Sequence, residues 1–166
     1  MPSTWLEDEM ELTLLDALLD PGHLMVVLAT LLTVVLCVLL HYEVSMALSR
    51  RMERSTRSQR QRFLTLIFGL LLAHIAEIWA FAATMSLLLE ISSTGDVIGI
   101  TAPGFLDFVY LSATNFTTLG YGDMVPTGPI RFVMGTEALT GFVLITWSAS
   151  LTFLEMQKHW RTNHPD

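Results

Sequence analysis

Three long stretches of this sequence carry almost no charge. Residues 24–40 hold no charged side chain, residues 63–89 hold only His74 and Glu77 as ionisable groups, and residues 132–154 hold only Glu137. At about 1.5 Å of rise per residue, helices of these lengths reach across or nearly across a hydrocarbon core of about 30 Å. The sequence therefore predicts three transmembrane helices.

The composition agrees with a membrane protein. Hydrophobic residues make up 52% of the chain and charged residues only 15%, against about 25% charged in a typical soluble domain. The apolar content excludes intrinsic disorder, the single cysteine, Cys37, excludes a disulfide scaffold, and the net charge of -7 argues against nucleic acid as a partner. Because the sequence contains neither a nucleophile–base set nor a metal-ligand cluster, we expect no enzyme and no cofactor.

The chain before the first stretch is acidic. A signal peptide would begin with positive charge, so residues 23–42 are interpreted as a transmembrane helix instead. Within residues 1–22, apolar side chains recur at four-residue spacing, at Leu6, Met10, Leu14 and Leu18. This pattern predicts an amphipathic helix lying at the outer membrane interface.

Basic residues gather in a predicted loop, residues 43–62. It contains six of the nine lysines and arginines of the chain, namely Arg50, Arg51, Arg54, Arg57, Arg60 and Arg62. The positive-inside rule places this loop in the cytoplasm, which puts the N-terminus outside and the tail, residues 156–166, inside. The arginines either set this topology alone or also contact anionic lipid head groups.

Residues 104–129 differ from the stretches on either side. Residues 105–116 have the composition of a helix but are too few to span a bilayer, and the residues after them are rich in Gly, Thr and Pro. A short helix followed by irregular chain between two spans is typical of a re-entrant loop. Such backbone is tolerated at membrane depth only where protein buries it or water lines it.

The re-entrant segment contains Thr117-Thr118-Leu119-Gly120-Tyr121-Gly122-Asp123. This string resembles the selectivity filter of the potassium channel pore family, whose central residue is usually valine or isoleucine where this chain has Leu119. The alternative interpretation is a glycine-rich extracellular loop. The resemblance covers residues 63–155 and implies an all-α membrane fold, with an outer helix, a pore helix, a filter strand and an inner helix. One chain supplies a quarter of a ring, so the resemblance also implies a homotetramer.

The residue types of the motif suit ion conduction. A dehydrated cation must exchange its water shell for oxygens, and the backbone carbonyls of Thr118, Leu119, Gly120, Tyr121 and Gly122 can supply them. The two glycines accept backbone angles that other residues resist. Three further residues are expected to support the filter: Thr117, Asp123, which raises the local cation concentration, and Glu137, which braces it from behind with Thr114 or Asn115 as partner.

Two further groups of residues have open interpretations. Gly141 lies near the position at which inner helices of the family often bend, and Gly141 and Gly135 serve either as a hinge or for close packing. His74 and Glu77 share a helix face. They form a structural pair, through a mutual hydrogen bond that neutralises both or a contact with Thr30 or Thr33, or they act as a proton sensor. A metal site is disfavoured because two ligands are too few.

The sequence thus predicts a multi-pass protein of the cell membrane that conducts potassium passively through a homotetrameric pore, with potassium ions bound at the filter. Two alternatives stay open. One is a non-selective cation channel on the same scaffold, and the other is a non-conducting subunit that regulates another channel.

Overall fold

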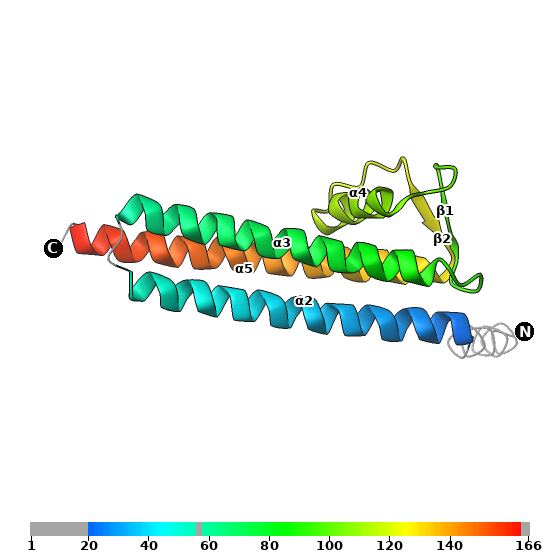
Figure 1. Ribbon diagram of the computed structural model, residues 1–166, viewed down its shortest axis with the longest axis horizontal. Helices are drawn as coiled ribbons and strands as arrows, with labels where there is room; N and C mark the ends of the chain where they lie inside the picture. Colours follow the sequence, from blue (N-terminus) through cyan, green and yellow to red (C-terminus); the bar gives the residue numbers. More distant parts are fainter. Residues whose placement is uncertain (1–19, 56–57, 164–166) are drawn as a thin grey trace, which may run out of the picture.

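Long helices, aligned along one axis, form the body of the molecule. The computed structural model describes residues 20–55 and 58–163. Within this part of the chain, α2 (Pro21–Glu53), α3 (Gln59–Leu88) and α5 (Arg131–Asn163) lie side by side along the long axis (Figure 1). Each contains an apolar window long enough to cross a membrane. The prediction of three transmembrane helices is confirmed.

The helix α2 begins at a well-formed cap and runs further than expected. Asp20 accepts a hydrogen bond from the backbone N–H of His23 at 3.1 Å, which holds the pKa of Asp20 below its usual value, and Pro21 suits the first helical position. At its other end α2 continues to Glu53. Most of residues 43–62, expected as a loop, is therefore helical, because this segment holds no glycine or proline to end the helix.

The connection between α2 and α3 is short and basic. Arg50, Arg51, Arg54 and Arg60 are exposed, and Arg62 is half-buried. Arg57 and the predicted interfacial helix around Leu6 to Leu18 lie outside the described residues. Contact between these arginines and anionic lipid stays a prediction.

The re-entrant helix α4 (Phe105–Phe116) has the predicted bounds. The backbone N–H of Gly104 donates to Asp107 at 2.8 Å, which fixes the start of the helix. α4 packs against α3 and α5 near the end of the bundle where α2 begins (Figure 1). With 12 residues, it reaches only part of the way across a bilayer.

A small sheet closes the base of the re-entrant loop. β1 (Asp96–Ile98) and β2 (Val125–Thr127) pair antiparallel, with Val97 opposite Pro126. The short 3₁₀ helix η1 (Gly128–Ile130) then leads into α5. The sheet joins the chain before α4 to the chain after the filter motif, so both ends of the loop are held together. Strands of three residues, far apart in sequence, leave no hydrophobic periodicity, and the sequence did not predict them.

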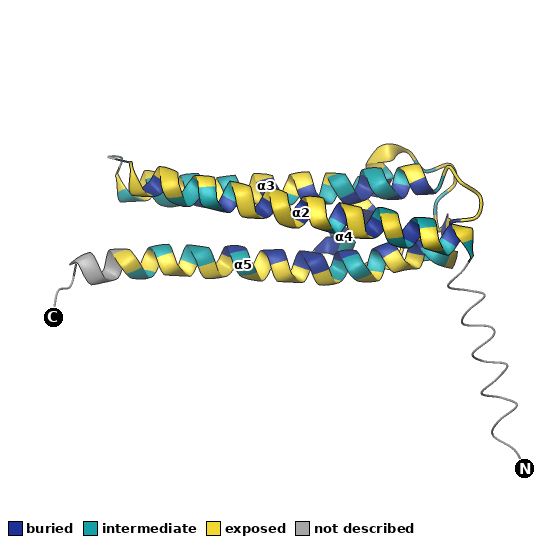
Figure 2. Cartoon of the chain, turned by 90° about the horizontal axis from the view of Figure 1, so that it is seen from below, coloured by how far each residue is buried: buried dark blue, intermediate teal, exposed yellow. Residues whose placement is uncertain are grey.

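Burial in the bundle is uneven. Most of the largest fully buried apolar side chains, among them Phe81, Phe116 and Leu144, belong to one cluster that joins α2, α3, α4 and α5, and Leu66 belongs to a second, smaller cluster. The outer faces of the long helices are exposed (Figure 2) and rich in leucine, such as Leu72, which is 66% exposed. Apolar surface of this extent fits lipid or further copies of the chain.

Gly141 is buried where α5 passes the end of α4. A Cβ atom at this position would overlap the backbone carbonyl of Phe116. At Gly135, no described atom lies within 4 Å of the equivalent position. The structure thus gives the packing interpretation of Gly141 a specific contact, while the hinge stays a prediction.

The substitution Gly141→Ala should lower the free energy of unfolding by about 1–3 kcal/mol, because the added methyl group overpacks the contact between α4 and α5. Gly135→Ala is the matched control and should leave stability unchanged or slightly higher. Denaturant unfolding of the detergent-solubilised protein measures both. Equal unfolding midpoints for the two variants would contradict the packing role.

Candidate functional site

The filter segment, defined here as residues 117–123, folds back onto the last turn of α4. The backbone N–H of Thr118 donates to the carbonyl of Asn115 at 2.8 Å. The N–H groups of Leu119 and Gly120 both donate to the carbonyl of Thr114, at 2.8 and 3.0 Å. These bonds satisfy carbonyls at the helix end that have no partner within the helix.

These hydrogen bonds fix the direction of the filter carbonyls. In a planar trans peptide, the C=O of one residue points opposite to the N–H of the next, and the described chain has no cis peptide bond. The N–H groups of residues 118–120 face α4. The carbonyls of residues 117–119 therefore form a row on the opposite, open side of the segment.

Every second residue of the filter segment has a positive φ. The angle is 59° at Thr118, 54° at Gly120 and 77° at Gly122. Glycine adopts such angles at little cost, as the sequence analysis expected. For Thr118 they are rare, because its branched side chain crowds the backbone. No sequence pattern indicated this strain. It is held by the hydrogen bonds to α4 and is typical of functional segments.

Tyr110 of α4 ties down the outer part of the filter segment. Its ring stacks on that of Tyr121, with centroids 6.5 Å apart and an interplanar angle of 6°. Its hydroxyl donates to Asp123 Oδ2 at 2.8 Å. At the inner end, the Thr117 hydroxyl donates to the carbonyl of Ala113 at 2.8 Å. Sequence reasoning missed Tyr110, because an aromatic residue on a short helix resembles any core residue.

The carboxyl of Glu137 lies between α5 and α4 and is fully buried. It contacts the hydroxyl of Ser112 closely and accepts a hydrogen bond from Asn115 Nδ2 at 3.0 Å. The same Asn115 amide also donates to the carbonyl of Met134 at 2.7 Å. Of the two expected partners, the structure brings Asn115 to Glu137, whereas the Thr114 hydroxyl bonds the carbonyl of Leu111.

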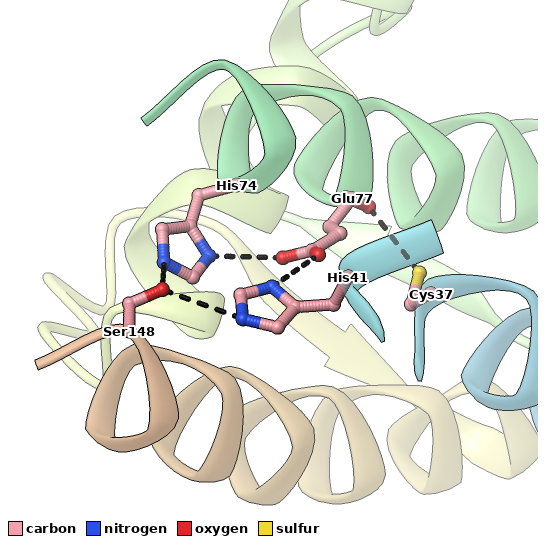
Figure 3. A network of polar contacts seen from close by, with 5 residues as sticks. All are labelled: Cys37, His41, His74, Glu77 and Ser148. Carbon is pink, nitrogen blue, oxygen red and sulfur yellow. Dashed lines mark hydrogen bonds and ion pairs between the residues drawn. The ribbon is translucent and has the colours of Figure 1, made fainter. Parts of the chain in front are cut away.

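His74 and Glu77 form a second polar group deeper in the bundle (Figure 3). Their closest side-chain atoms lie 2.9 Å apart, and His41 of α2 reaches the other oxygen of Glu77, also at 2.9 Å. Of the two structural alternatives, the mutual hydrogen bond of His74 and Glu77 is present, and the contact with Thr30 or Thr33 is not. Thr30 bonds the carbonyl of Val26, and Thr33 bonds the carbonyl of Ala29 and the hydroxyl of Thr84.

Sequence reasoning did not single out His41, although a signal exists. Along α2, the buried positions recur every three or four residues and are mostly small or polar: Gly22, Val26, Thr30, Thr33, Cys37, His41 and Ser45. In an apolar helix, such a stripe marks the face that packs against protein. Each oxygen of Glu77 pairs with a different imidazole. The expectation that only two potential ligand residues meet here is wrong, because ligand atoms of His41, His74 and Glu77 lie within 4.8 Å of one another.

Comparisons with known proteins agree with this geometry. The family model described as "Ion channel" matches residues 63–158, which is more than half of the chain. The inward rectifier potassium channel Kirbac3.1 of Paramagnetospirillum magnetotacticum is 38% identical over 93 residues. That alignment covers 55% of this chain and 28% of Kirbac3.1, so the chain spans little more than a quarter of that relative. No solved structure matches the chain.

The family match includes α3, the re-entrant loop and most of α5, which is the region that the filter motif had marked. The matched family is one of ion channels and not of enzymes. The chain therefore belongs to the ion channel family of two-helix potassium channel pore domains, and it carries one additional membrane helix, α2, before the pore domain.

Proposed function

We propose that this protein is a potassium-selective channel in which four copies surround one conduction axis. The observation that carries this proposal is the row of carbonyls of residues 117–119, which faces away from α4. A potassium ion that sheds its water needs a ring of such oxygens. One chain lines one side of the ring, so fourfold symmetry is required to close it. The similarity to a bacterial potassium channel supports this choice of ion.

The exposure of the filter segment in the single chain supports the same assembly. All residues from 117 to 123 are exposed, and no described atom lies within 4 Å of where a side chain on Gly120 or Gly122 would begin. In the proposed tetramer this open side faces the other three copies. The C-terminal end of α4 points its partial negative charge toward the same region, which favours a cation.

The proposed orientation follows from the two ends of the bundle. The filter segment and α4 lie near the start of α2, and the exposed arginines lie at and beyond its far end (Figure 1). With the arginines in the cytoplasm, the re-entrant segment enters the membrane from outside. Asp123, held by Tyr110, then lies at the outer mouth, where its charge attracts cations.

We also propose that Glu137 braces the filter. It accepts hydrogen bonds from two side chains of α4, Ser112 and Asn115, and thereby fixes α4 against α5. Since the filter carbonyls take their direction from the last turn of α4, a shift of α4 would misalign them. Errors of about 1 Å in such a site have large functional effects.

Purified protein in liposomes should carry potassium current whose reversal potential follows the potassium gradient and ignores the sodium gradient. Gly120→Ala should abolish this current, because alanine resists the φ of 54° at this position. Gly135→Ala is the matched control and should conduct. A reversal potential set equally by sodium, or no flux from folded protein, would overturn the proposal in favour of a non-selective channel or a regulatory subunit.

Replacement of Glu137 by leucine should cost about 1–3 kcal/mol of unfolding free energy and should reduce potassium selectivity. One buried amide hydrogen of Asn115 loses its acceptor, and the Ser112 hydroxyl keeps only the carbonyl of Ile78. Glu137→Gln keeps an acceptor oxygen and should retain most of both. Thr114→Val is the control, since that hydroxyl bonds only within α4. Denaturation and reversal potentials are measured for all three. If Glu137→Leu behaves like Thr114→Val, Glu137 is no brace.

A further inference from the structure

Four polar side chains from three helices form a closed ring inside the bundle (Figure 3). His41 Nδ1 and His74 Nδ1 each lie 2.9 Å from a different oxygen of Glu77. The Nε2 atoms of the same imidazoles lie 3.4 and 3.0 Å from the Oγ of Ser148 on α5. Each side chain thus has two neighbours in the ring, and each imidazole uses both of its nitrogens.

The ring needs a defined number of hydrogens. Each of its four contacts holds one hydrogen when it is a hydrogen bond. An ionised carboxylate brings none, a neutral imidazole brings one and a hydroxyl brings one. With Glu77 ionised and both histidines neutral, the ring is one hydrogen short. One added proton completes all contacts, and it also brings the net charge of the ring to zero.

Burial makes this proton count important. His41 and Glu77 are fully buried, and Ser148 is nearly so. A buried polar atom without a partner is costly, and so is a net charge at membrane depth. Both costs fall on the ring when it is one hydrogen short, and both disappear when the proton is bound. A second added proton would place two hydrogens in one contact and restore a net charge.

The surroundings leave the ring to balance its own charge. From α2, the thiol of Cys37 lies 3.9 Å from the backbone carbonyl of Glu77, and the ring of Tyr42 contacts that of Trp147. From α5, the ring of Trp147 contacts that of His41 at a tilt, and the carboxyl of Glu137 is hydrogen-bonded to side chains of α4.

The helix α4 presents an apolar ring to the cluster. Phe116 lies 5.9 Å from His74 between ring centroids. The titratable groups Asp107 and Tyr110 of α4 bond Gly104 and Asp123 instead.

One edge of the ring lies outside the packed interior. His74 and Ser148 line an open groove of about 210 Å³ between α3 and α5, together with apolar side chains such as Leu71. The side chain of His74 is 15% exposed there, whereas that of His41 is fully buried. His74 is therefore the imidazole of the ring that is open to the surroundings.

We propose that His41, Glu77, His74 and Ser148 form a proton-binding site that takes up one proton per subunit and, when protonated, ties α2 and α3 to α5. The effect of this site on conduction rests on the proposed function, since α5 would be the pore-lining helix. The binding of the proton does not rest on it. Loss of the proton leaves one contact of the ring without a hydrogen, so the stabilisation is present at low pH and is lost as the pH rises.

The first experiment measures thermal unfolding of the detergent-solubilised protein from about pH 5 to about pH 8, the range in which histidine titrates. The midpoint of the wild-type protein should fall as pH rises, by roughly 2–4 °C, a shift typical of one lost interaction in a chain of this size. His41→Gln and His74→Gln should flatten this pH dependence. His23→Gln, which changes an exposed histidine at the start of α2, should preserve it.

A second variant keeps the proposal testable if a histidine variant does not fold. Ser148→Ala keeps every titrating group but removes the link to α5, and it should weaken the pH dependence of the midpoint. Ser150→Ala is its control, because that hydroxyl bonds only the carbonyl of Thr146 on its own helix. If His41→Gln does not fold, the comparison of these two serine variants decides the matter, and equal pH profiles would overturn the proposal.

Potassium flux in liposomes at the same pH values separates this proposal from the proposed function. Wild-type flux should change with pH, and the response should be absent in His74→Gln. A protein that shows the stability profile without any potassium flux would retain the proton site and lose the channel function. Potassium flux combined with unaltered pH profiles in both histidine variants would retain the channel function and overturn the proton site. A midpoint that responds to micromolar Zn²⁺ and not to pH would also overturn the proton site.

Discussion

The hydrogen bonds between the filter segment and the last turn of α4 are the contacts on which the rest of the site depends. At membrane depth an irregular segment is tolerated only where protein satisfies its backbone groups or water lines it. The carbonyl of Thr114 serves two N–H groups at once. This arrangement directs the carbonyls of residues 117–119 to one side and holds Thr118 in a conformation that it would otherwise avoid.

The remaining contacts keep α4 in place. The sheet β1–β2 closes the base of the loop, Glu137 joins α4 to α5, and Tyr110 fixes the outer residues. Close approach at Gly141 lets α5 pass the end of α4. These contacts join α4 and its flanking chain to α5, to the sheet and to the filter segment, so the position of the filter depends on how the elements around α4 pack.

The helices and the filter motif could be predicted because their signals are local. Length and uniform apolarity define a span, and glycine at every second position marks an unusual backbone. The roles of Ser112, Tyr110 and His41 depend on which helices become neighbours, which no local pattern contains. The end of α2 was predicted wrongly for a different reason. The charged residues after 42 were taken to end the helix, but the residues of this arginine-rich segment are mostly good helix formers.

The length of α2 and α5 has a mechanical consequence. Each has 33 residues, or about 50 Å of helix, which exceeds the apolar thickness of a membrane by several turns. A stiff rod that pivots inside the bilayer amplifies its motion with distance from the pivot. A slight change in tilt near the cluster of His41 would therefore displace the arginine-bearing ends further than the residues beside the cluster. A force applied from outside the membrane would in turn change the tilt most when it acts at these ends.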